Sequence, residues 1–285
     1  MQRPVLPPEA ILITGCSSGI GYRTARVLQD MGYHVIATAR KAEDVAWLDG
    51  EFNAFQLDLA DTASIESALT AILKFTHHRL SAVFHNGAFG LPGALEDISR
   101  DALRHQFETN VFGTHELNRL LIAHFRKQGH GRIIFNSSVL GFAAMGYRGA
   151  YNMSKYAIEG MADTLRLELS GSNISVSLIE PGPIESRFRA NAFREFTTWV
   201  NTDNSAHKAQ YEGMIARLQK EGAAAPFTLP PEAVANKVKS ALTSYWPAAR
   251  YRVTLPTKVF WWFKRLLPTR WLDVVLYKAG GGGKR

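Results

Sequence analysis

Cysteine is almost absent from this chain, because Cys16 is its single example among 285 residues. One cysteine excludes a disulfide framework within the chain and a cysteine-rich zinc site, so we expect a reducing compartment and a cytoplasmic protein. No apolar run reaches the roughly 18 residues that a membrane-spanning helix needs. The opening sequence MQRPVLPPEA also contains no apolar core of a signal peptide. We therefore expect no targeting or spanning segment.

Acidic residues are outnumbered by basic ones, 25 against 33, and the formal net charge is +8. Most of this excess lies in residues 256–285, where Lys and Arg face Asp273 alone and the tail carries +6. The rest of the chain is nearly neutral at +2. This distribution argues against a nucleic-acid partner, which would call for a continuous basic face. The distribution still allows the body to bind an anionic ligand and the tail to bind an anionic surface.

Short apolar runs alternate with helical patterns along the chain. The pattern predicts strands at 10–14, 34–37, 52–56, 82–85, 132–136, 175–179 and 251–255. Helices are predicted at 20–31, 62–75, 100–127, 151–170 and 231–245. This alternation indicates an α/β fold with a doubly wound parallel sheet of about seven strands and helices on both faces.

A glycine-rich loop, TGCSSGIG, directly follows the first predicted strand. Its glycines allow a sharp turn into a helix, whose N-terminal N–H groups could bind a pyrophosphate. The alternative is a plain strand–helix turn, but the position between a buried strand and an amphipathic helix favours dinucleotide binding. The expected contacts are Gly15, Ser17, Ser18, Gly19, Ile20 and Gly21.

The second strand and the residues after it read VIATARK, a segment that helps to distinguish between the two nicotinamide cofactors. An NAD site places a carboxylate here to bind the ribose 2′-hydroxyl. This chain has Arg40 and no acid, and a guanidinium can pair with a 2′-phosphate. We therefore predict NADP(H), with the alternative that Arg40 only begins a solvated helix.

Tyr151 and Lys155 lie four residues apart on a predicted helix and therefore on one face. A nearby ammonium favours the phenolate, so Lys155 is expected to lower the tyrosine pKa towards the range of general acid–base catalysis. A pair of this kind is most often a surface pair when it stands alone. Ser138, however, follows a strand at the sheet edge where doubly wound folds bind ligands, which favours a catalytic group.

Together these motifs resemble the short-chain dehydrogenase/reductase family over roughly residues 10–190 and 230–255. The resemblance rests on TGxxxGxG, Asp58, the turn at Asn86, Asn110, Ser138, Tyr151-x-x-x-Lys155 and Pro181-Gly182. The chain is most similar to the branch that holds 17β-hydroxysteroid and retinol dehydrogenases and bacterial NADP-dependent aldehyde reductases. The resemblance implies a Rossmann-type fold with a helical lid and a C-terminal helical tail.

The resemblance also implies a role for each matching residue. Tyr151 would be the general acid in carbonyl reduction, Ser138 would stabilise the developing alkoxide, and Lys155 would hold the nicotinamide ribose. Asn110 would support a water that passes protons to Lys155. Further cofactor contacts would be Asp58, Leu59, Asn86, Gly87, Ala88, Pro181, Gly182 and Ser186. The family's Asn-Asn-Ala-Gly turn is His85-Asn86-Gly87-Ala88 here, which leaves its backbone conformation open.

Residues 186–227 are expected to form a substrate lid within a single catalytic domain that spans 1–255. A structural helix pair is the alternative. Aromatic side chains would give the lid an apolar inner wall: Phe188, Phe193, Phe196, Trp199 and Tyr211. Phe188 would line the substrate pocket together with Met145 and Tyr147.

The tail, residues 256–285, alternates aromatic and basic side chains. We expect it to pack on the body or on another subunit, with its charges solvated. The side chains expected to pack are Phe260, Trp261, Leu266, Trp271 and Val275. The alternative is an amphipathic helix in peripheral contact with an anionic membrane.

Two residues have a reactive and a structural interpretation. Cys16 at a helix N-terminus could be an activated thiol, and His85 could be a catalytic imidazole. A small residue in a turn and a core histidine are the favoured interpretations. No cluster has the spacing of metal ligands, so we expect no metal.

The sequence therefore predicts an NADP(H)-dependent oxidoreductase that reduces a small apolar aldehyde or ketone, or oxidises the matching alcohol. We expect a homodimer or homotetramer. One alternative is a membrane-surface dehydrogenase of steroids, retinoids or lipids. The other is a regulator that binds NADP(H) without catalysis, although such a protein would not need the proton-transfer group.

Overall fold

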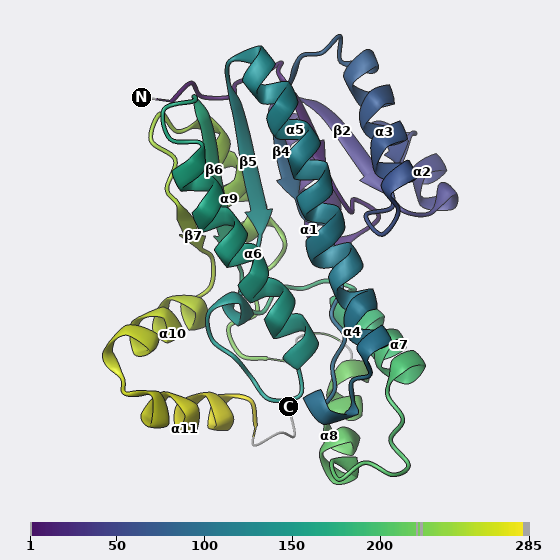
Figure 1. The fold of residues 1–285 in the computed structure, drawn as a ribbon, viewed down its shortest axis with the longest axis vertical. Coiled ribbons are helices and arrows are strands. Elements are labelled where there is room, and N and C mark those ends of the chain that lie inside the picture. Colours follow the sequence, from purple (N-terminus) through teal and green to yellow (C-terminus); the bar gives the residue numbers. More distant parts are fainter. Residues whose placement is uncertain (1, 221, 223–224, 282–285) are drawn as a thin grey trace.

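The computed structural model describes residues 2–220, 222 and 225–281. Within them, parallel strands form one seven-stranded sheet in the order β3-β2-β1-β4-β5-β6-β7 (Figure 1). The strands are β1 (Ala10–Ile13), β2 (His34–Ala39), β3 (Asn53–Gln56), β4 (Leu80–His85), β5 (Gly131–Asn136), β6 (Ile174–Glu180) and β7 (Arg250–Arg252). The predicted α/β class and doubly wound parallel sheet are confirmed.

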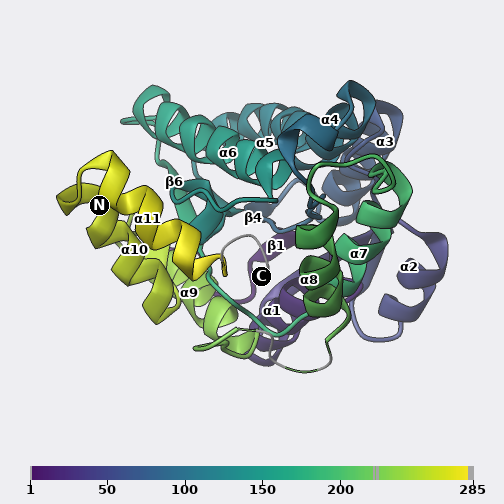
Figure 2. The ribbon, with the colours of Figure 1, turned by 90° about the horizontal axis from the view of Figure 1, so that it is seen from below.

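Helices cover both faces of the sheet (Figure 2). One face carries α3 (Thr62–Phe75), α5 (Thr114–Gln128) and α6 (Gly149–Glu168), and the other carries α1 (Gly19–Asp30), α2 (Ala42–Leu48) and α9 (Glu232–Thr243). Strand β1 contributes to both cores. Leu12 packs on the side of α3, α5 and α6, and Ile11 and Ile13 pack on the side of α1 and α9. Because side chains alternate along a strand, a strand covered on both faces is apolar throughout.

The order of the strands reverses between β1 and β4. The chain builds β1, β2 and β3 outwards, then returns to place β4 on the other side of β1. Doubly wound folds bind their ligands at the carboxyl ends of the strands, at such a switch point. The predicted residues Gly15, Asn86, Ser138 and Gly182 follow β1, β4, β5 and β6 at this edge.

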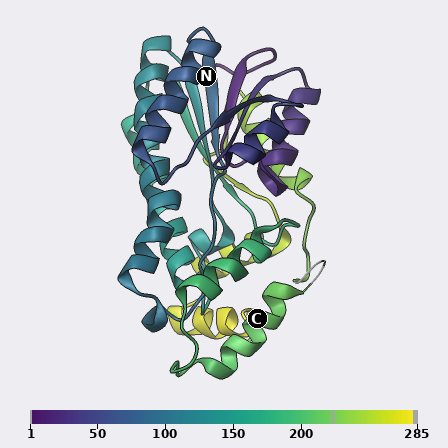
Figure 3. The same ribbon diagram turned by 90° about the vertical axis from the view of Figure 1, so that its right-hand side faces the viewer.

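Two helical segments lie beyond this edge of the sheet (Figures 1 and 3). The helices α7 (Phe188–Trp199) and α8 (Lys208–Gln219) pack together through Phe196, Tyr211 and Met214. The helices α10 (Leu255–Leu266) and α11 (Thr269–Ala279) form the tail. Among the helices of the described chain, none combines the length and the apolar character that crossing a membrane would need.

The helix predicted at 100–127 is divided in the structure. The helix α4 covers Arg100–Phe107, a π-helical turn covers Glu108–Gly113, and α5 follows. The wider turn contains Asn110, whose side chain binds the backbone of Phe89. Turns of this type occur frequently at functional sites. Apolar periodicity does not reveal one extra residue in a turn, so the division could not be predicted.

Two other elements differ from the prediction. The strand predicted at 251–255 ends at Arg252, because Thr254 caps α10 by accepting the N–H of Thr257. The helix α2 was not predicted, since its seven residues are too few to show a helical period.

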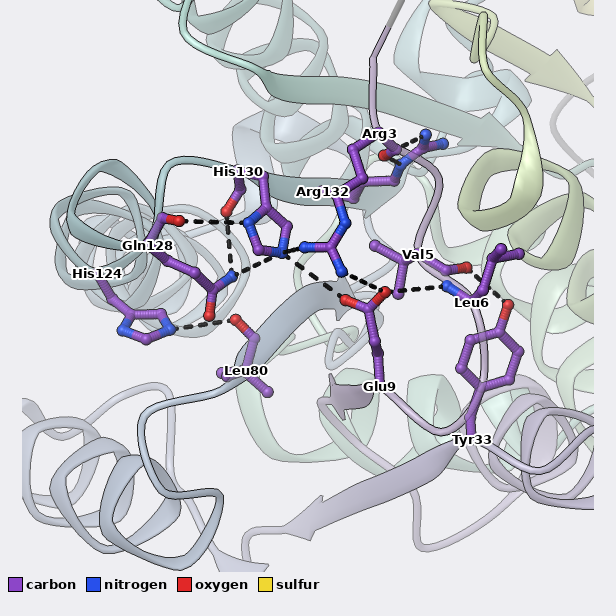
Figure 4. Close-up of polar contacts among 10 residues, drawn as sticks. All are labelled: Arg3, Val5, Leu6, Glu9, Tyr33, Leu80, His124, Gln128, His130 and Arg132. Carbon is purple, nitrogen blue, oxygen red and sulfur yellow. Dashed lines mark hydrogen bonds and ion pairs between the residues drawn. The ribbon is translucent and has the colours of Figure 1, made fainter.

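The N-terminal segment is bound to the amino end of the sheet by Arg132 on β5 (Figure 4). Arg132 is 2% exposed, and it donates to the carbonyl oxygens of Arg3 at 2.8 Å and of Ser244 at 2.6 Å. Glu9 pairs with Arg3 at 3.1 Å and faces His130 at 3.7 Å. This cluster lies at the amino ends of the strands, opposite to the predicted site.

Candidate active site

Close approach of backbone shapes the glycine-rich loop between β1 and α1. Gly15 and Gly19 have positive φ angles of 70° and 58°, which favour glycine. A Cβ on Gly21 would lie 2.2 Å from the carbonyl oxygen of Gly15, so no side chain fits there. The N-cap residue Ser18 makes no side-chain bond to the first turn of α1 in the described chain. The loop and the helix N-terminus therefore fit a pyrophosphate group.

Thr14 and Asn86 connect this loop to the turn after β4. Thr14 Oγ1 accepts the N–H groups of Asn86 at 2.9 Å and of Gly87 at 2.8 Å. Asn86 Nδ2 donates to the carbonyl oxygens of Thr14 and Gly15, both at 3.1 Å. Gly87 has no positive φ, but a Cβ there would lie 3.1 Å from Leu59 Cδ1. Glycine in this altered turn therefore provides space, not left-handed backbone.

Ser138 and Tyr151 meet on the other side of the switch point. Ser138 follows β5, and its hydroxyl accepts the N–H of Leu140 at 3.1 Å. Tyr151 lies in the first turn of α6, with its hydroxyl beside Ser138. Burial raises the pKa of Tyr151 above its ordinary value, and the nearby Ser138 hydroxyl lowers it by less. Tyr151 is therefore a neutral phenol at neutral pH.

Lys155 lies one turn further along α6. Its Nζ is 5.6 Å from the centre of the Tyr151 ring, and it donates to the carbonyl oxygen of Asn136 at 2.6 Å. Burial lowers the pKa of Lys155 to about 8, while the charge of Glu159 raises it. The expected lowering of the Tyr151 pKa by Lys155 is wrong for this structure, because burial of the phenol is the largest influence on that pKa.

Asn110 is 2% exposed, and its amide binds two elements that flank the site. Its Nδ2 donates to the carbonyl oxygen of Phe89 at 2.9 Å and to Ser154 Oγ at 3.1 Å. Its Oδ1 accepts the N–H of Phe89 at 3.2 Å. Asn110 therefore holds the loop after β4 against the helix that carries Lys155.

The predicted adenosine contacts follow β2 and β3, next to β1. Arg40 is exposed after β2, and within the described residues it forms no ion pair, whereas Lys41 pairs with Glu43 at 3.0 Å. Asp58 accepts the N–H of Ala60 at 2.9 Å after β3. Leu59 is buried beside Gly87. These positions extend the site from the phosphate loop towards β3.

The loop after β6 forms the far rim of the site. The carbonyl oxygen of Pro181 accepts the N–H of Val139 at 2.7 Å, which links this rim to Ser138. Ser186 is exposed, and its Cβ lies 3.1 Å from where a Cβ on Gly19 would be. The remaining predicted contacts are half-buried: Ser17 and Ile20 in the glycine-rich loop, and Ala88 and Gly182 in the loops after β4 and β6.

Two of the predicted pocket residues lie beside Tyr151. Phe188 contacts its ring edge-on, with 5.2 Å between the ring centroids. Met145 shares an apolar cluster with Tyr151 and with Leu276 of the tail. Tyr147 instead binds the lid, because its hydroxyl lies 3.1 Å from His207 Nδ1. The lid thus reaches the tyrosine through Phe188.

The other lid aromatics do not form one wall. Phe196 and Tyr211 are buried between α7 and α8, with Phe193 packed against the same cluster. Trp199 stacks on His105, with ring centroids 5.1 Å apart.

His85 and Cys16 are packing residues, as favoured from the sequence. The His85 ring stacks on Phe135, and burial lowers its pKa to about 3. The Cys16 thiol donates to the carbonyl oxygen of Ile13 at 3.3 Å, and burial raises its pKa to about 12. Across residues 2–220, 222 and 225–281, no group of three or more His, Cys, Asp or Glu is placed to hold a metal.

Asn136 is a site residue that was not predicted. Its carbonyl oxygen accepts the hydrogen bond from the Lys155 ammonium, and its Nδ2 donates to Asn86 Oδ1 at 2.9 Å. It thereby connects the catalytic helix to the phosphate loop. A polar residue at the end of an apolar strand, directly before Ser137 and Ser138, was the available indication.

A buried ion cluster behind α6 was also not predicted. Glu180, 1% exposed, pairs with Arg250 at 3.1 Å and with Arg252 at 3.2 Å. Arg250 also pairs with Glu159 at 3.1 Å. Burial raises the pKa of Glu180 to about 7, and the charge of Glu159 adds to this effect. The cluster joins α6, β6 and β7 directly behind the loop that begins at Pro181.

A glycine-rich dinucleotide loop and a Ser–Tyr–Lys group at the carboxyl edge of a doubly wound sheet define a class of nicotinamide-dependent oxidoreductases. The family model for short chain dehydrogenases matches residues 9–196. The chain belongs to the short-chain dehydrogenase/reductase family.

Relatives and solved structures agree with this assignment. A protein of Escherichia coli (strain K12), uncharacterized oxidoreductase YbbO, is 42% identical over 94% of each chain. An NADPH-dependent 3-dehydrocapnine reductase of Ornithobacterium rhinotracheale is 32% identical and covers 94% of this chain and 95% of its own. A crystal structure of a family member from Burkholderia phymatum in complex with NAD has a TM-score of 0.77 at 20% identity and covers 94% of each chain. At that identity the likeness supports the fold alone.

Proposed function

We propose that this protein is an NADP(H)-dependent oxidoreductase that reduces an aldehyde or ketone, or oxidises the matching alcohol, by hydride transfer. The observation that carries the proposal is the group of Ser138, Tyr151 and Lys155 beside the glycine-rich loop. A protein that only senses a dinucleotide has no physical need for a proton donor, an oxyanion partner and an ammonium in one group. A catalytic function is therefore the better explanation.

The residues along the carboxyl edge of the sheet fit a dinucleotide phosphate. The loop from Gly15 to Gly21 would hold the pyrophosphate, and Arg40 would pair with a 2′-phosphate. Asp58 and Leu59 would lie at the adenine end, and Lys155, Pro181, Gly182 and Ser186 at the nicotinamide end. The name of the Ornithobacterium rhinotracheale relative, which is NADPH-dependent, supports NADP(H). When bound, the reduced nicotinamide supplies the hydride.

Tyr151 would donate the proton to the carbonyl oxygen in the reduction. Burial raises its pKa, which keeps the phenol protonated at neutral pH, and an alkoxide is a much stronger base than a phenolate. Proton transfer to the developing alkoxide is therefore downhill. The Ser138 hydroxyl would hydrogen-bond the same oxygen and stabilise its negative charge.

Lys155 would act after the proton has moved. With a pKa of about 8 it is mostly an ammonium at pH 7, so it favours the phenolate that Tyr151 leaves behind. Asn110 and Asn136 hold the elements around this lysine in position. The raised pKa of Tyr151 and the charge of Lys155 thus serve different stages of one proton transfer.

The surroundings of Tyr151 favour a substrate with an apolar group next to its carbonyl. Phe188 and Met145 border the tyrosine, and both present apolar surface. We propose that residues 186–227 act as a lid over a catalytic domain that spans 1–255. Phe188 supports this role because it joins the lid to Tyr151.

The direct test is to follow the absorbance of reduced nicotinamide with the purified full chain. We expect consumption of NADPH with at least one member of a panel of short and long aldehydes, ketones, sterols and retinoids, and a lower rate with NADH. Tight binding of NADPH without turnover on the whole panel, and with no reduction of NADP on the matching alcohols, would instead support a regulator.

A further inference from the structure

Helices α10 and α11 expose an unusual amount of apolar surface. Of the seventeen large hydrophobic side chains that are exposed on the described residues, six lie on this short segment. They are Leu255, Trp262, Leu266, Trp271, Val274 and Tyr277, each more than half exposed. The expected packing of Leu266 and Trp271 on the body is therefore wrong. Large exposed apolar patches usually mark an interaction site.

The exposed side chains lie on the outer faces of the two helices. On the inner faces, Phe260 of α10 and Leu272 and Leu276 of α11 pack in one cluster that includes Val139 and Leu140 of the body. Helical spacing places Trp262 about half a turn from Phe260, and Val274 about half a turn from Leu272. Because both helices rest on the same cluster, both outer faces point away from the body.

Basic side chains flank this apolar surface. Lys258, Arg265, Arg270 and Lys278 are exposed, and Asp273 is the only acid among residues 256–281. Lys264 is exposed as well, and it donates to the carbonyl oxygen of Phe142 at 2.6 Å. Exposed tryptophans next to Lys and Arg are typical of helices that lie on an anionic membrane surface.

A basic hollow of about 420 Å³ opens beside α10. Its walls come from α9, β7 and α10: Lys237, Arg250, Tyr251, Arg252, Lys258, Trp261 and Trp262. Arg250 and Arg252 pair with carboxylates of Glu180, Glu159 and Asp163 behind the hollow, so Lys237 and Lys258 give the hollow its excess positive charge. Trp262 lines the hollow and also belongs to the exposed surface. The hollow and the outer face of the helices are therefore continuous.

We propose that the outer face of α10 and α11 docks on an anionic lipid bilayer, with a lipid phosphate in the adjoining basic hollow. Apolar side chains, chiefly Trp262 and Trp271, would enter the headgroup region, and the basic side chains would pair with lipid charge. The excess of positive charge on this segment is what favours an anionic bilayer over a second copy of the chain, since two copies would repel each other here.

Docking in this orientation brings the reaction site close to the bilayer. The inner face of the same two helices belongs to the cluster that contains Tyr151 and Met145. A carbonyl compound dissolved in the membrane would then be a natural substrate. This consequence rests on the proposed function, whereas the docking itself does not.

The test is flotation of the full chain with vesicles of phosphatidylcholine, with and without phosphatidylglycerol. We expect binding only to the vesicles that contain phosphatidylglycerol, and weaker binding as salt is raised. Replacing Trp262 and Trp271 together by Ala should weaken binding by about tenfold or more. The matched control replaces Trp47 and Trp246, which are 50% and 72% exposed outside this surface, and should leave binding unchanged.

A second pair of variants tests the hollow. Each basic residue near an anionic membrane contributes about fivefold to binding, so replacing Lys237 and Lys258 together by Gln should weaken binding by about twenty-five-fold. Lys239 lies on α9 outside the hollow, and Lys127 lies on α5. The control variant with both of these replaced by Gln should bind as the unchanged chain does.

Three results would overturn the proposal: no binding to phosphatidylglycerol vesicles, equal binding to neutral vesicles, or a tryptophan variant that changes the oligomeric state and leaves vesicle binding intact. The last result would identify a contact between copies of this chain. Vesicle binding without turnover of any carbonyl compound would leave docking in place and contradict the proposed function alone.

Discussion

Burial of single ionisable residues sets the chemistry of the candidate active site. It raises the pKa of the Tyr151 phenol and lowers that of the Lys155 ammonium, so it favours the neutral form of each. The spacing of Tyr151, Lys155 and Ser138 predicted that these residues share a site. Spacing carries no information on how deeply a side chain is buried, and this is why the direction of the Tyr151 shift was predicted wrongly.

Glu180 should make the stability of the folded chain fall as the pH rises. Its pKa of about 7 in the folded chain lies above the ordinary 4.5, so between these values the unfolded chain has released the proton that the folded chain still holds. Raising the pH through this window therefore lowers the free energy of unfolding. Thermal melts of Glu180→Gln from pH 4.5 to 7 should show a flatter dependence than the unchanged chain. Glu185→Gln, at an exposed position, should retain the original slope, and equal slopes for all three would refute the assignment.

Arg40 should determine the choice of cofactor. A charge-assisted hydrogen bond to a 2′-phosphate contributes about 1.5–3 kcal/mol, so Arg40→Ala should raise the KM for NADPH by about ten- to a hundredfold. The KM for NADH should change little, because NADH has no 2′-phosphate. Arg26→Ala removes a half-buried cation on α1, which pairs with Glu51, and serves as the control. An equal effect of Arg40→Ala on both cofactors would contradict the assignment.

The regular elements could be predicted where their period was long enough to see. Every strand of the sheet was expected near its observed position, and the helices on its two faces, apart from α2, were expected from their apolar spacing. The π-helical turn at Glu108–Gly113 and the short helix α2 could not be predicted. The first adds one residue to a turn, and the second is shorter than two helical periods.

Asn110→Ala tests what the π-helical turn does. The substitution would leave the N–H of Phe89 without its side-chain partner and would remove the bond to Ser154, while the carbonyl oxygen of Phe89 would keep its bond from Gln106. We expect a loss of about 2–3 kcal/mol of stability, measured by chemical denaturation, and a lower kcat because α6 is less well held. Asn236→Ala, at an exposed position on α9, should have little effect on either. Unchanged stability of Asn110→Ala would show that the turn does not depend on these bonds.

The arrangement of the whole molecule was only partly accessible from the sequence. The periodicity of the tail showed that its helices are amphipathic, but not which side chains rest on the body. That depends on the cluster with Val139 and Leu140, which comes from a distant part of the chain. The carboxyl edge of the sheet was predictable as the site, because parallel strands bring all their carboxyl ends together.

We expect a second exposed apolar strip to form a contact between subunits. Along α6, Met153, Tyr156 and Leu167 are 42%, 40% and 75% exposed on one face, and Phe112 of the π-helical turn is 52% exposed. Light scattering of the purified chain should give the mass of a homodimer or homotetramer, and Leu167→Arg should shift it towards the monomer. Leu6→Arg, at an exposed position near the N-terminus, is the control. A monomeric unchanged chain would refute the prediction.

Removing the hydroxyl group of Tyr151 provides the most direct test of the proposed chemistry. Tyr151→Phe keeps the ring and its contact with Phe188 but removes the hydroxyl that meets Ser138. With the best carbonyl substrate, kcat should fall by about a hundredfold to ten-thousandfold, since general acid–base catalysis contributes that much. The dissociation constant of NADPH, measured by fluorescence titration, should stay within about twofold, because the ring still fills its place. Unchanged turnover by Tyr151→Phe would contradict the assignment of this tyrosine as the proton donor.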